Sequence, residues 1–508
     1  MEKALPYILS RPKHYALCIK HYALCIMNYA LIACVLVACS QKPVDVQNVD
    51  ELPPIFPDYV GVTIPTDVAP LNFNVDGAEY VCAVAKGSLG GELTASGELA
   101  DFDIDDWHAL TRQNQGGTIA VSVTAKQSDG KWIGYRDFEI NVSGDPLDEY
   151  GLTYRKIAPG YETFSNIGIY QRDIHTFDED AIVSHTALQG ECMNCHVANR
   201  CDPHRFQLHI RGQHAATLVQ IDGKRKLLQT KTDSTIANCM YAYWHPSGRY
   251  CAYSLNLINQ CFWEDTTRYI EVFDLASDAL VMDMEKDEII LSPLLKTKDF
   301  ESYPVFSADG KTIYYCTSRP LHNEADLVNM QYDLCAISFD EATGRIGDHA
   351  DTIIHASKMG KSITHPRPSY DGKYIMYSMA DYSVFPIHHP EADLYIMDIA
   401  TGESRALTEV NSNRAESFHN WSRNSRWFVF SSRRYNNQNN LLYIAHFGDD
   451  GKAGKPFLLP QRNPREYYHR LIHSYNVPDF TSEKVELDIR AFADEIYNSG
   501  RIQVGVRH

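Results

Sequence analysis

Residues 303–319 read YPVFSADGKTIYYCTSR, a tight Ser-x-Asp-Gly turn followed by a strand that alternates apolar and polar residues. Three further segments repeat this phrase: YWHPSGRYCAYSLN at 243–256, HPRPSYDGKYIMYSMA at 365–380 and HNWSRNSRWFVFSSRR at 419–434. The serines aligned in this way are Ser247, Ser307, Ser369 and Ser422, at intervals of 60, 62 and 53 residues. A unit of strand, turn and strand at so long a period is typical of β-propeller blades, because one blade cannot bury its faces alone.

The repeat extends on both sides of these phrases. Each phrase leads into a further strand, such as DLYIMDIATG at 393–402. Upstream, IGIYQRDIHTF at 167–177 and ATLVQIDGKRKLLQT at 216–230 have the same alternation. We therefore predict an all-β fold whose main part is a propeller of about six blades, with the repeats at 235–480 and the first blade within 149–234.

A smaller domain is expected before the propeller. Residues 56–148 contain short alternating runs punctuated by Gly, Asp and Asn, which predicts a β-sandwich. Within it, DIDDWHALTR at 103–112 predicts a short helix capped by an Asp. The last segment, 481–508, is predicted to contain a helix from Asp488 to Tyr497.

The N-terminus has the features of an export signal. Basic residues are followed by the apolar run YALIACVLVA at 29–38 and then by Cys39. Leu36-Val37-Ala38-Cys39 resembles the lipobox of bacterial lipoproteins, which implies cleavage after residue 38 and a lipid on Cys39. An uncleaved membrane anchor is the alternative. Residues 39–55 then form a polar tether, and the protein is expected in the bacterial envelope, on the periplasmic side rather than the cell surface.

The segment GECMNCHVANR at 190–200 contains Cys192-Met193-Asn194-Cys195-His196. Two thiols at this spacing can add to the two vinyl groups of a haem, and the adjacent histidine can then bind the iron. An exported chain meets the requirement that attachment happens outside the cytoplasm. We predict one covalent haem c held by Cys192, Cys195 and His196, with a Cys-x-x-Cys disulfide or a zinc site as alternatives.

Several segments together resemble one family, among them PDYVGVTIPTDVAPLNF, CMNCH, FQLHIRG, WHPSGRY and SYNVPDF. It is a family of envelope lipoproteins from Bacteroides-type bacteria that combine a small N-terminal β domain, a single c-type haem motif and a TolB-like propeller. The resemblance covers nearly all of the chain after the signal. It implies a haem segment inserted near the first blade.

The second iron ligand decides whether such a haem carries electrons or binds ligands. The candidates downstream of the motif are His204, His209, His214 and Met240. His209 matches the His-x-Arg-Gly position of the family, which favours it, although a hydrogen-bonded core histidine is the alternative. Arg211 is a candidate partner for a haem propionate, because a guanidinium pairs with a carboxylate through two parallel hydrogen bonds.

Three histidines, His245, His365 and His419, fall near the same place in three repeats, with Arg367 close to the second. They are candidates for a metal or small-ligand site at one mouth of the channel, although hydrogen bonding within turns is the favoured interpretation. Cys316 and Cys335 lie on neighbouring predicted strands and are a candidate disulfide, which an oxidising envelope permits.

The net charge of −18 argues against nucleic acid as a partner. No nucleophile elbow, phosphate loop or recognisable carboxylate pair names a reaction. The sequence therefore favours a monohaem c-type cytochrome lipoprotein that passes single electrons to a protein redox partner. A propeller scaffold whose haem is structural or absent is the alternative, and a haem enzyme is a weaker one.

Overall fold

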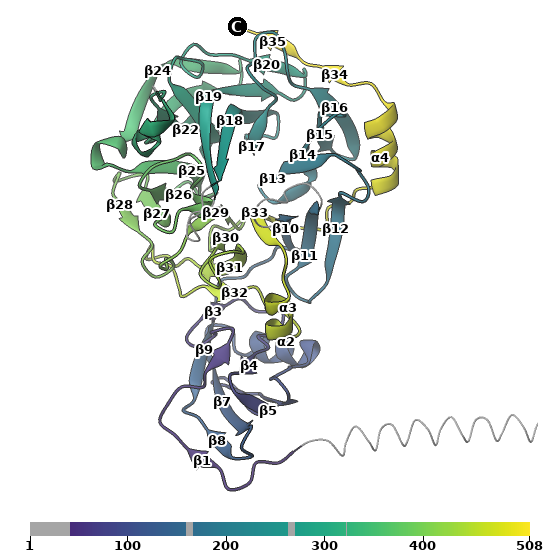
Figure 1. Ribbon diagram of the computed structural model, residues 1–508, viewed down its shortest axis with the longest axis vertical. Coiled ribbons are helices and arrows are strands. Elements are labelled where there is room, and N and C mark those ends of the chain that lie inside the picture. The colour runs from purple at the N-terminus through teal and green to yellow at the C-terminus, as the bar shows by residue number, and fades with distance from the viewer. Residues whose placement is uncertain (1–40, 159–165, 263–269, 322) are drawn as a thin grey trace, which may run out of the picture.

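The computed structural model describes residues 41–158, 166–262, 270–321 and 323–508. The chain is all-β and has two parts, a small N-terminal domain and a ring of six sheets (Figure 1). In the described ranges no helix is long and apolar enough to cross a membrane. The predicted signal and the lipid-bearing Cys39 lie outside the described residues.

The N-terminal domain is built on one seven-stranded sheet in the order β1-β8-β7-β5-β6, with β9 beside β7 and β3 beside β9. The strands are β1 (Gln47–Asn48), β3 (Thr63–Ile64), β5 (Ala78–Gly87), β6 (Glu92–Gly97), β7 (Thr118–Gln127), β8 (Trp132–Gly134) and β9 (Phe138–Val142). A separate pair is formed by β2 (Ile55–Phe56) and β4 (Asn74–Val75).

The predicted sandwich is therefore corrected to one main sheet with a helix against it. The long strand β7 pairs with both β9 and β8 along a single edge, which joins strands that a sandwich would divide between two layers. Helix α2 (Ile104–Gln113) packs on β5 and β6, and its N-terminus is capped by the Asp103 side chain. The predicted capped helix is confirmed.

Six further sheets follow, each with four antiparallel strands. Sheet I contains β33 (Ser474–Thr481), β10 (Gly151–Ile157), β11 (Ile167–Asp173) and β12 (Glu179–Ser184). Sheet II contains β13 (Cys192–Asn199), β14 (Asp202–Arg211), β15 (Ala216–Ile221) and β16 (Lys224–Gln229). Sheet III contains β17 (Met240–Trp244), β18 (Tyr250–Phe262), β19 (Ile270–Asp283) and β20 (Glu288–Ile290).

The remaining three sheets have the same order. Sheet IV contains β21 (Phe300–Phe306), β22 (Thr312–Ser318), β23 (Asp333–Asp340) and β24 (Arg345–Ile354). Sheet V contains β25 (Ser362–Pro368), β26 (Tyr374–Ala380), β27 (Asp393–Asp398) and β28 (Ser404–Ala406). Sheet VI contains β29 (Glu416–Trp421), β30 (Trp427–Ser432), β31 (Leu441–His446) and β32 (Phe457–Leu458). Three short 3-10 helices lie between strands: η1 (Glu324–Asn329), η2 (Ser357–Met359) and η3 (Pro386–His388).

The ring is closed by the C-terminal part of the chain. The inner strands β13, β17, β21, β25, β29 and β33 contact one another in that order, and β33 contacts β13. Strand β33 is the inner strand of sheet I, where it pairs with β10 from the start of the ring. Helix α3 (Pro464–His469) comes just before β33 in the chain. Helix α4 (Ile489–Asn498) follows β33 and begins at Asp488, as predicted. Strands β34 (Ile502–Gln503) and β35 (Gly505–Arg507) then extend sheets II and III at their outer edges.

The repeated turn has a common hydrogen-bond pattern that explains its sequence. In the second repeat, Ser307 accepts a hydrogen bond from the backbone N–H of Thr312, and Gly310 adopts φ +73°. Ser369 and Ser422 make the same contacts in the third and fourth repeats. Gly is suited to the left-handed position because it has no Cβ.

The first repeat is aligned differently from the prediction. In the second repeat the N–H of Ser307 donates to Thr312 O, and that of Gly310 donates to Ser307 O. In the first repeat the N–H of His245 donates to Tyr250 O, and that of Gly248 donates to His245 O. His245, not Ser247, therefore corresponds to Ser307. The Ser247 side chain bonds the His245 ring within the turn, at 2.8 Å. His245 therefore replaces the turn serine of the other repeats.

The predicted disulfide between Cys316 and Cys335 is not formed, and both are free thiols. Cys335 lies opposite Tyr315 in the β22–β23 register, so its side chain shares a face with Tyr315. Successive side chains of a strand point to opposite faces, which places Cys316 on the other side of the sheet. The two cysteines accordingly belong to different apolar cores.

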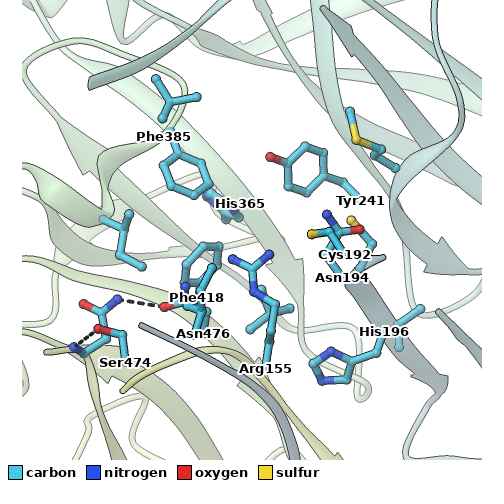
Figure 2. A pocket seen from close by; sticks show the side chains of 18 of the residues that line it. Arg155, Cys192, Asn194, His196, Tyr241, His365, Phe385, Phe418, Ser474 and Asn476 are labelled. Atoms are coloured by element: carbon cyan, nitrogen blue, oxygen red, sulfur yellow. Dashed lines mark hydrogen bonds between the residues drawn. The ribbon is translucent and has the colours of Figure 1, made fainter. Parts of the chain in front are cut away.

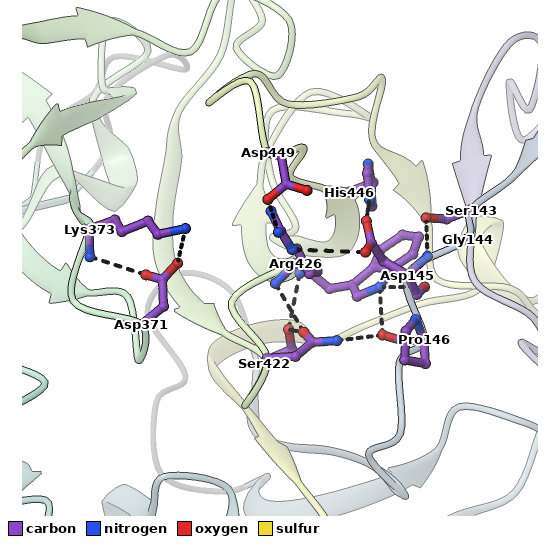
Figure 3. A network of polar contacts seen from close by, with 12 residues as sticks. Ser143, Gly144, Asp145, Pro146, Asp371, Lys373, Ser422, Arg426, His446 and Asp449 are labelled. Atoms are coloured by element: carbon purple, nitrogen blue, oxygen red, sulfur yellow. Dashed lines mark hydrogen bonds and ion pairs between the residues drawn. The ribbon is translucent and has the colours of Figure 1, made fainter. Parts of the chain in front are cut away.

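The N-terminal domain is fixed to sheet VI through a polar and apolar contact (Figure 3). Trp427 is fully buried and donates from Nε1 to the carbonyl of Pro146 at 3.1 Å. His446 Nε2 lies 2.7 Å from Asp145 Oδ2, and Arg426 pairs with Asp449 beside it. The domain thus lies against one outer side of the ring, away from its centre (Figure 1).

Candidate functional site

One left-handed residue in each inner strand shapes the centre of the ring. A β-bulge interrupts the pairing of every inner strand with its neighbour, and one residue at the bulge has φ between 49° and 53°, a region that residues other than Gly rarely adopt. The six residues are Cys195, Tyr241, Tyr303, His365, Phe418 and Val477. Four of their rings form a continuous group through tilted and edge-to-face contacts, with centroid distances of 4.2 Å between Tyr303 and His365 and 5.0 Å between His365 and Phe418.

A cavity of about 220 Å³ lies beside this group (Figure 2). Its wall comes from five of the six inner strands, from β10, and from residues of β18, β19 and η3. Segments more than 300 residues apart in the chain, such as Arg155 and Asp479, meet here. The cavity is the point of convergence of the ring, the usual position of a small-ligand site.

The Cys-x-x-Cys-His segment is the first part of β13, the inner strand of sheet II. It is therefore part of the ring and not an inserted segment. In a regular strand, residues three positions apart face opposite sides, but the bulge after Asn194 changes this phase. As a result Cys192 and Cys195 both line the cavity, and both are free thiols. Burial raises the pKa of the Cys195 thiol.

His196 is buried in the wall of the cavity with 2% of its surface exposed. Neither ring nitrogen has a hydrogen-bond partner among the described residues. Burial lowers its pKa from 6.5 to about 4, against an opposing effect of the Thr153 backbone and with a smaller lowering by the charge of Arg155, so the imidazole is neutral at pH 7. A neutral imidazole with an unpaired nitrogen is the form that binds a metal.

The predicted iron ligand His209 lies on the wrong face of sheet II. His196 shares its face with Phe206, whose core contacts are with sheet I. His209 faces the other way, towards sheet III, and its Nδ1 lies 3.1 Å from the Thr217 hydroxyl. His209 is not among the residues that line the cavity, so it is a hydrogen-bonded core histidine and not the predicted iron ligand.

Two of the other predicted residues do reach the cavity. Arg211 lies opposite Cys192 in the β13–β14 register and lines the cavity wall. Met240, the first residue of β17, also lines it. Both approach the motif from neighbouring strands.

His204 and His214 are not part of the cavity wall. The side chain of His204 is 63% exposed and lies 3.5 Å from Glu483. The Nδ1 atom of His214 lies 2.8 Å from Glu191 Oε1. Neither histidine is placed to bind an iron at His196.

The three repeated histidines do not form one site. His365 lines the cavity, whereas His245 bonds the carbonyl of Gly310 at 3.1 Å within the turn region. His419 is buried between strands. No group of three or more His, Cys, Asp or Glu residues placed to hold a metal occurs in the part of the chain that the structure describes.

Two charged residues of the wall, Arg155 and Asp479, were missed by sequence reasoning, whereas Arg367 had been noted beside His365. Arg155, Arg367 and Asp479 line the cavity, and burial raises the pKa of Asp479 to about 7. Asn420 donates to Asp479 at 2.7 Å. A sequence pattern marks Arg367 and Asp479, because in THPRP and NVPDF a proline follows the left-handed residue and the next residue lines the cavity.

No protein-family model and no curated protein matches the sequence. Among solved structures, an oligogalacturonate lyase in complex with manganese has a TM-score of 0.36 and 16% identity over 57% of this chain and 70% of its own. Prolyl oligopeptidase B from Galerina marginata has a TM-score of 0.33 and 13% identity over 61% of this chain and 44% of its own. A puromycin-hydrolysing peptidase of Mycobacterium tuberculosis has a TM-score of 0.35 and 10% identity over 79% of this chain and 57% of its own. The present chain thus spans about half the length of the two peptidases, and similarities this distant carry no function.

The residues at the motif fit a covalently bound haem. Two free thiols face one cavity, and the adjacent imidazole is neutral with both nitrogens unpaired. Asn194 Oδ1 and His365 Nε2, also on the wall, are buried without partners. Buried polar atoms are usually paired in a folded protein, and these atoms are available to pair with a ligand or with water.

Proposed function

We propose that this protein is a monohaem c-type cytochrome lipoprotein that carries single electrons in the bacterial envelope. In this proposal the six sheets are the blades of a TolB-like propeller that holds the haem at its centre and docks a protein redox partner. The observation that carries it is the meeting of Cys192, Cys195 and the unpaired His196 at one wall of the central cavity.

Each residue of the motif would have a separate task. The thiols of Cys192 and Cys195 would anchor the haem through thioether bonds, and His196 would offer a neutral nitrogen to the iron. The haem, when bound, supplies one-electron redox chemistry. His196 needs no proton removed before it binds, because its pKa of about 4 keeps it neutral.

The surrounding wall would supply the apolar contacts and any second iron ligand. Tyr241, Phe385 and Phe418 contribute aromatic surface to it. With His209 on the opposite face, the candidates for a second iron ligand are the cavity residues Met240 and His365. A methionine or histidine there favours electron transfer over ligand binding.

The test is a pyridine haemochrome spectrum of protein matured in the envelope. We expect one covalent haem per chain, and its loss in Cys195→Ala. Cys335→Ala is the matched control, because Cys335 is a buried thiol of sheet IV far from the motif. If the wild-type protein carried no covalent haem, the cytochrome proposal would be wrong and a propeller scaffold would be the better description.

Attachment to the membrane is tested separately. We propose that Cys39 carries the lipid, so the wild-type protein should sediment with membranes and Cys39→Ala should become soluble. Retention of that variant in the membrane would instead indicate an uncleaved anchor.

A further inference from the structure

The central cavity has an excess of positive charge. Arg155, Arg211 and Arg367 line it, and Asp479 is the one carboxylate among the described residues of its wall. None of the three guanidinium groups forms an ion pair with a carboxylate in the described ranges. The excess stands out in a chain whose net charge is −18.

Two of these groups flank the motif. Arg155 and Arg211 line the same cavity wall as Cys192 and Cys195. Arg211 approaches from β14, next to Cys192 in the register, and Arg155 approaches from β10. Figure 2 shows the Arg155 side chain reaching into the space between Phe418 and the cysteine-bearing strand.

The donors of Arg155 are only partly used. Its Nε is buried without a partner. One terminal nitrogen lies 3.2 Å from the Asn476 side-chain oxygen when that amide is turned to face it. A guanidinium presents five donors in a planar fork, and a carboxylate can accept two of them at once.

Arg155 is half-buried, and leaving its Nε unpaired is costly, because a buried charge is stabilised when an opposite charge accepts its hydrogen bonds. Arg211 is exposed at the end of β14, where its guanidinium can meet the charged end of a ligand. The aromatic side chains of Tyr241, Phe385 and Phe418 belong to the same wall and suit an apolar body. The arrangement suits a ligand with an apolar part and one or more carboxylates.

We propose that Arg155 and Arg211 together bind carboxylate groups of a ligand in the central cavity, beside Cys192 and Cys195. The carboxylates belong either to the propionates of the attached haem or to a small free carboxylate. The first source rests on the proposed function, and the second does not.

Two arms of one experiment separate these sources. In the first, Arg155→Gln and Arg211→Gln are made in the protein matured in the envelope, and the midpoint potential of the haem is measured by spectroelectrochemistry. We expect a lower potential in both, because loss of a positive charge beside the haem favours the oxidised iron. Arg155→Lys keeps the charge and should recover most of the shift. Arg345→Gln, whose side chain is 72% exposed on β24, is the control and should leave the potential unchanged.

In the second arm the Cys192→Ala/Cys195→Ala protein, which cannot attach haem, is titrated calorimetrically with succinate and with benzoate. Saturable 1:1 binding that is weakened at least tenfold by Arg155→Gln would identify a free carboxylate as the ligand. A shift of potential without such binding would identify the propionates. An unchanged potential in both glutamine variants together with no binding of either probe would overturn the inference. If the wild-type protein acquired no haem, the proposed function would fail and the titration alone would decide this inference.

Discussion

His209→Gln tests the assignment of His209 to the core of sheet II. The side chain is 3% exposed, and burial, followed by the charge of Arg211, lowers its pKa from 6.5 to about 4. The unfolded chain takes up a proton on this histidine below pH 6.5, but the folded chain does not until about pH 4. The unfolding free energy of the protein is therefore unaffected by this group at pH 7 and falls as the pH drops below 6.5, because protons then stabilise the unfolded chain. The loss is about 2 kcal/mol at pH 5 and about 3 kcal/mol below pH 4.

The assay is urea unfolding of the wild-type protein and of His209→Gln at pH 7 and at pH 5. Other buried histidines also destabilise the protein in acid, so the informative quantity is the difference between the two proteins. We expect the unfolding free energy of His209→Gln to fall by about 2 kcal/mol less than that of the wild type between these pH values. Any constant cost of the substitution cancels in this comparison.

The same variant separates the two roles considered for His209. If His209 is a core residue, the haem spectrum of His209→Gln matured in the envelope is unchanged. A changed axial-ligand spectrum, or an acid dependence equal to that of the wild type, would refute the reasoning from the two faces of sheet II.

Three further predictions concern the fold. Cys316 and Cys335 should both be alkylated in the denatured, unreduced protein, and a crosslinked peptide containing the pair would contradict their placement on opposite faces. Gly310→Ala should lower the unfolding free energy more than Gly402→Ala. Both glycines have φ +73°, but only at Gly310 would a new Cβ collide with a neighbour, the His245 ring. Equal losses of unfolding free energy in urea would refute this prediction. Trp427→Ala should cost about 3 to 5 kcal/mol, measured in the same way, since it empties a fully buried site between sheet VI and the N-terminal domain, and a loss under 1 kcal/mol would contradict that packing.

The repeated turn was predictable because its chemistry is local. Ser, Asp and Gly at fixed offsets bond one another within a few residues, so the phrase at 303–319 predicts the same turn wherever it occurs. The capped helices at Asp103 and Asp488 follow from equally local bonds. His245 was misaligned because a histidine can take the place of the turn serine, which the pattern did not anticipate.

The errors at the site come from long-range geometry. The phase of a strand decides which face a side chain occupies, and the bulge at Cys195 is imposed by the ring as a whole. In sheet II, His209 and His196 lie on opposite faces. In sheet IV, Cys316 and Cys335 lie on opposite faces as well. Their spacing in the sequence had suggested that each pair could meet.

The sequence by itself determined the class of fold, the blade-like repeat and the motif Cys192-x-x-Cys195-His196, because these depend on alternation, turn chemistry and spacing over short stretches. Only the tertiary structure decided that the motif belongs to an inner strand and that Arg155, Met240 and His365 share its cavity. The reason is that β33, from the end of the chain, closes the ring on β10, and six bulged strands then meet around one centre. Contacts made by that closure join residues hundreds of positions apart, for which no local pattern exists.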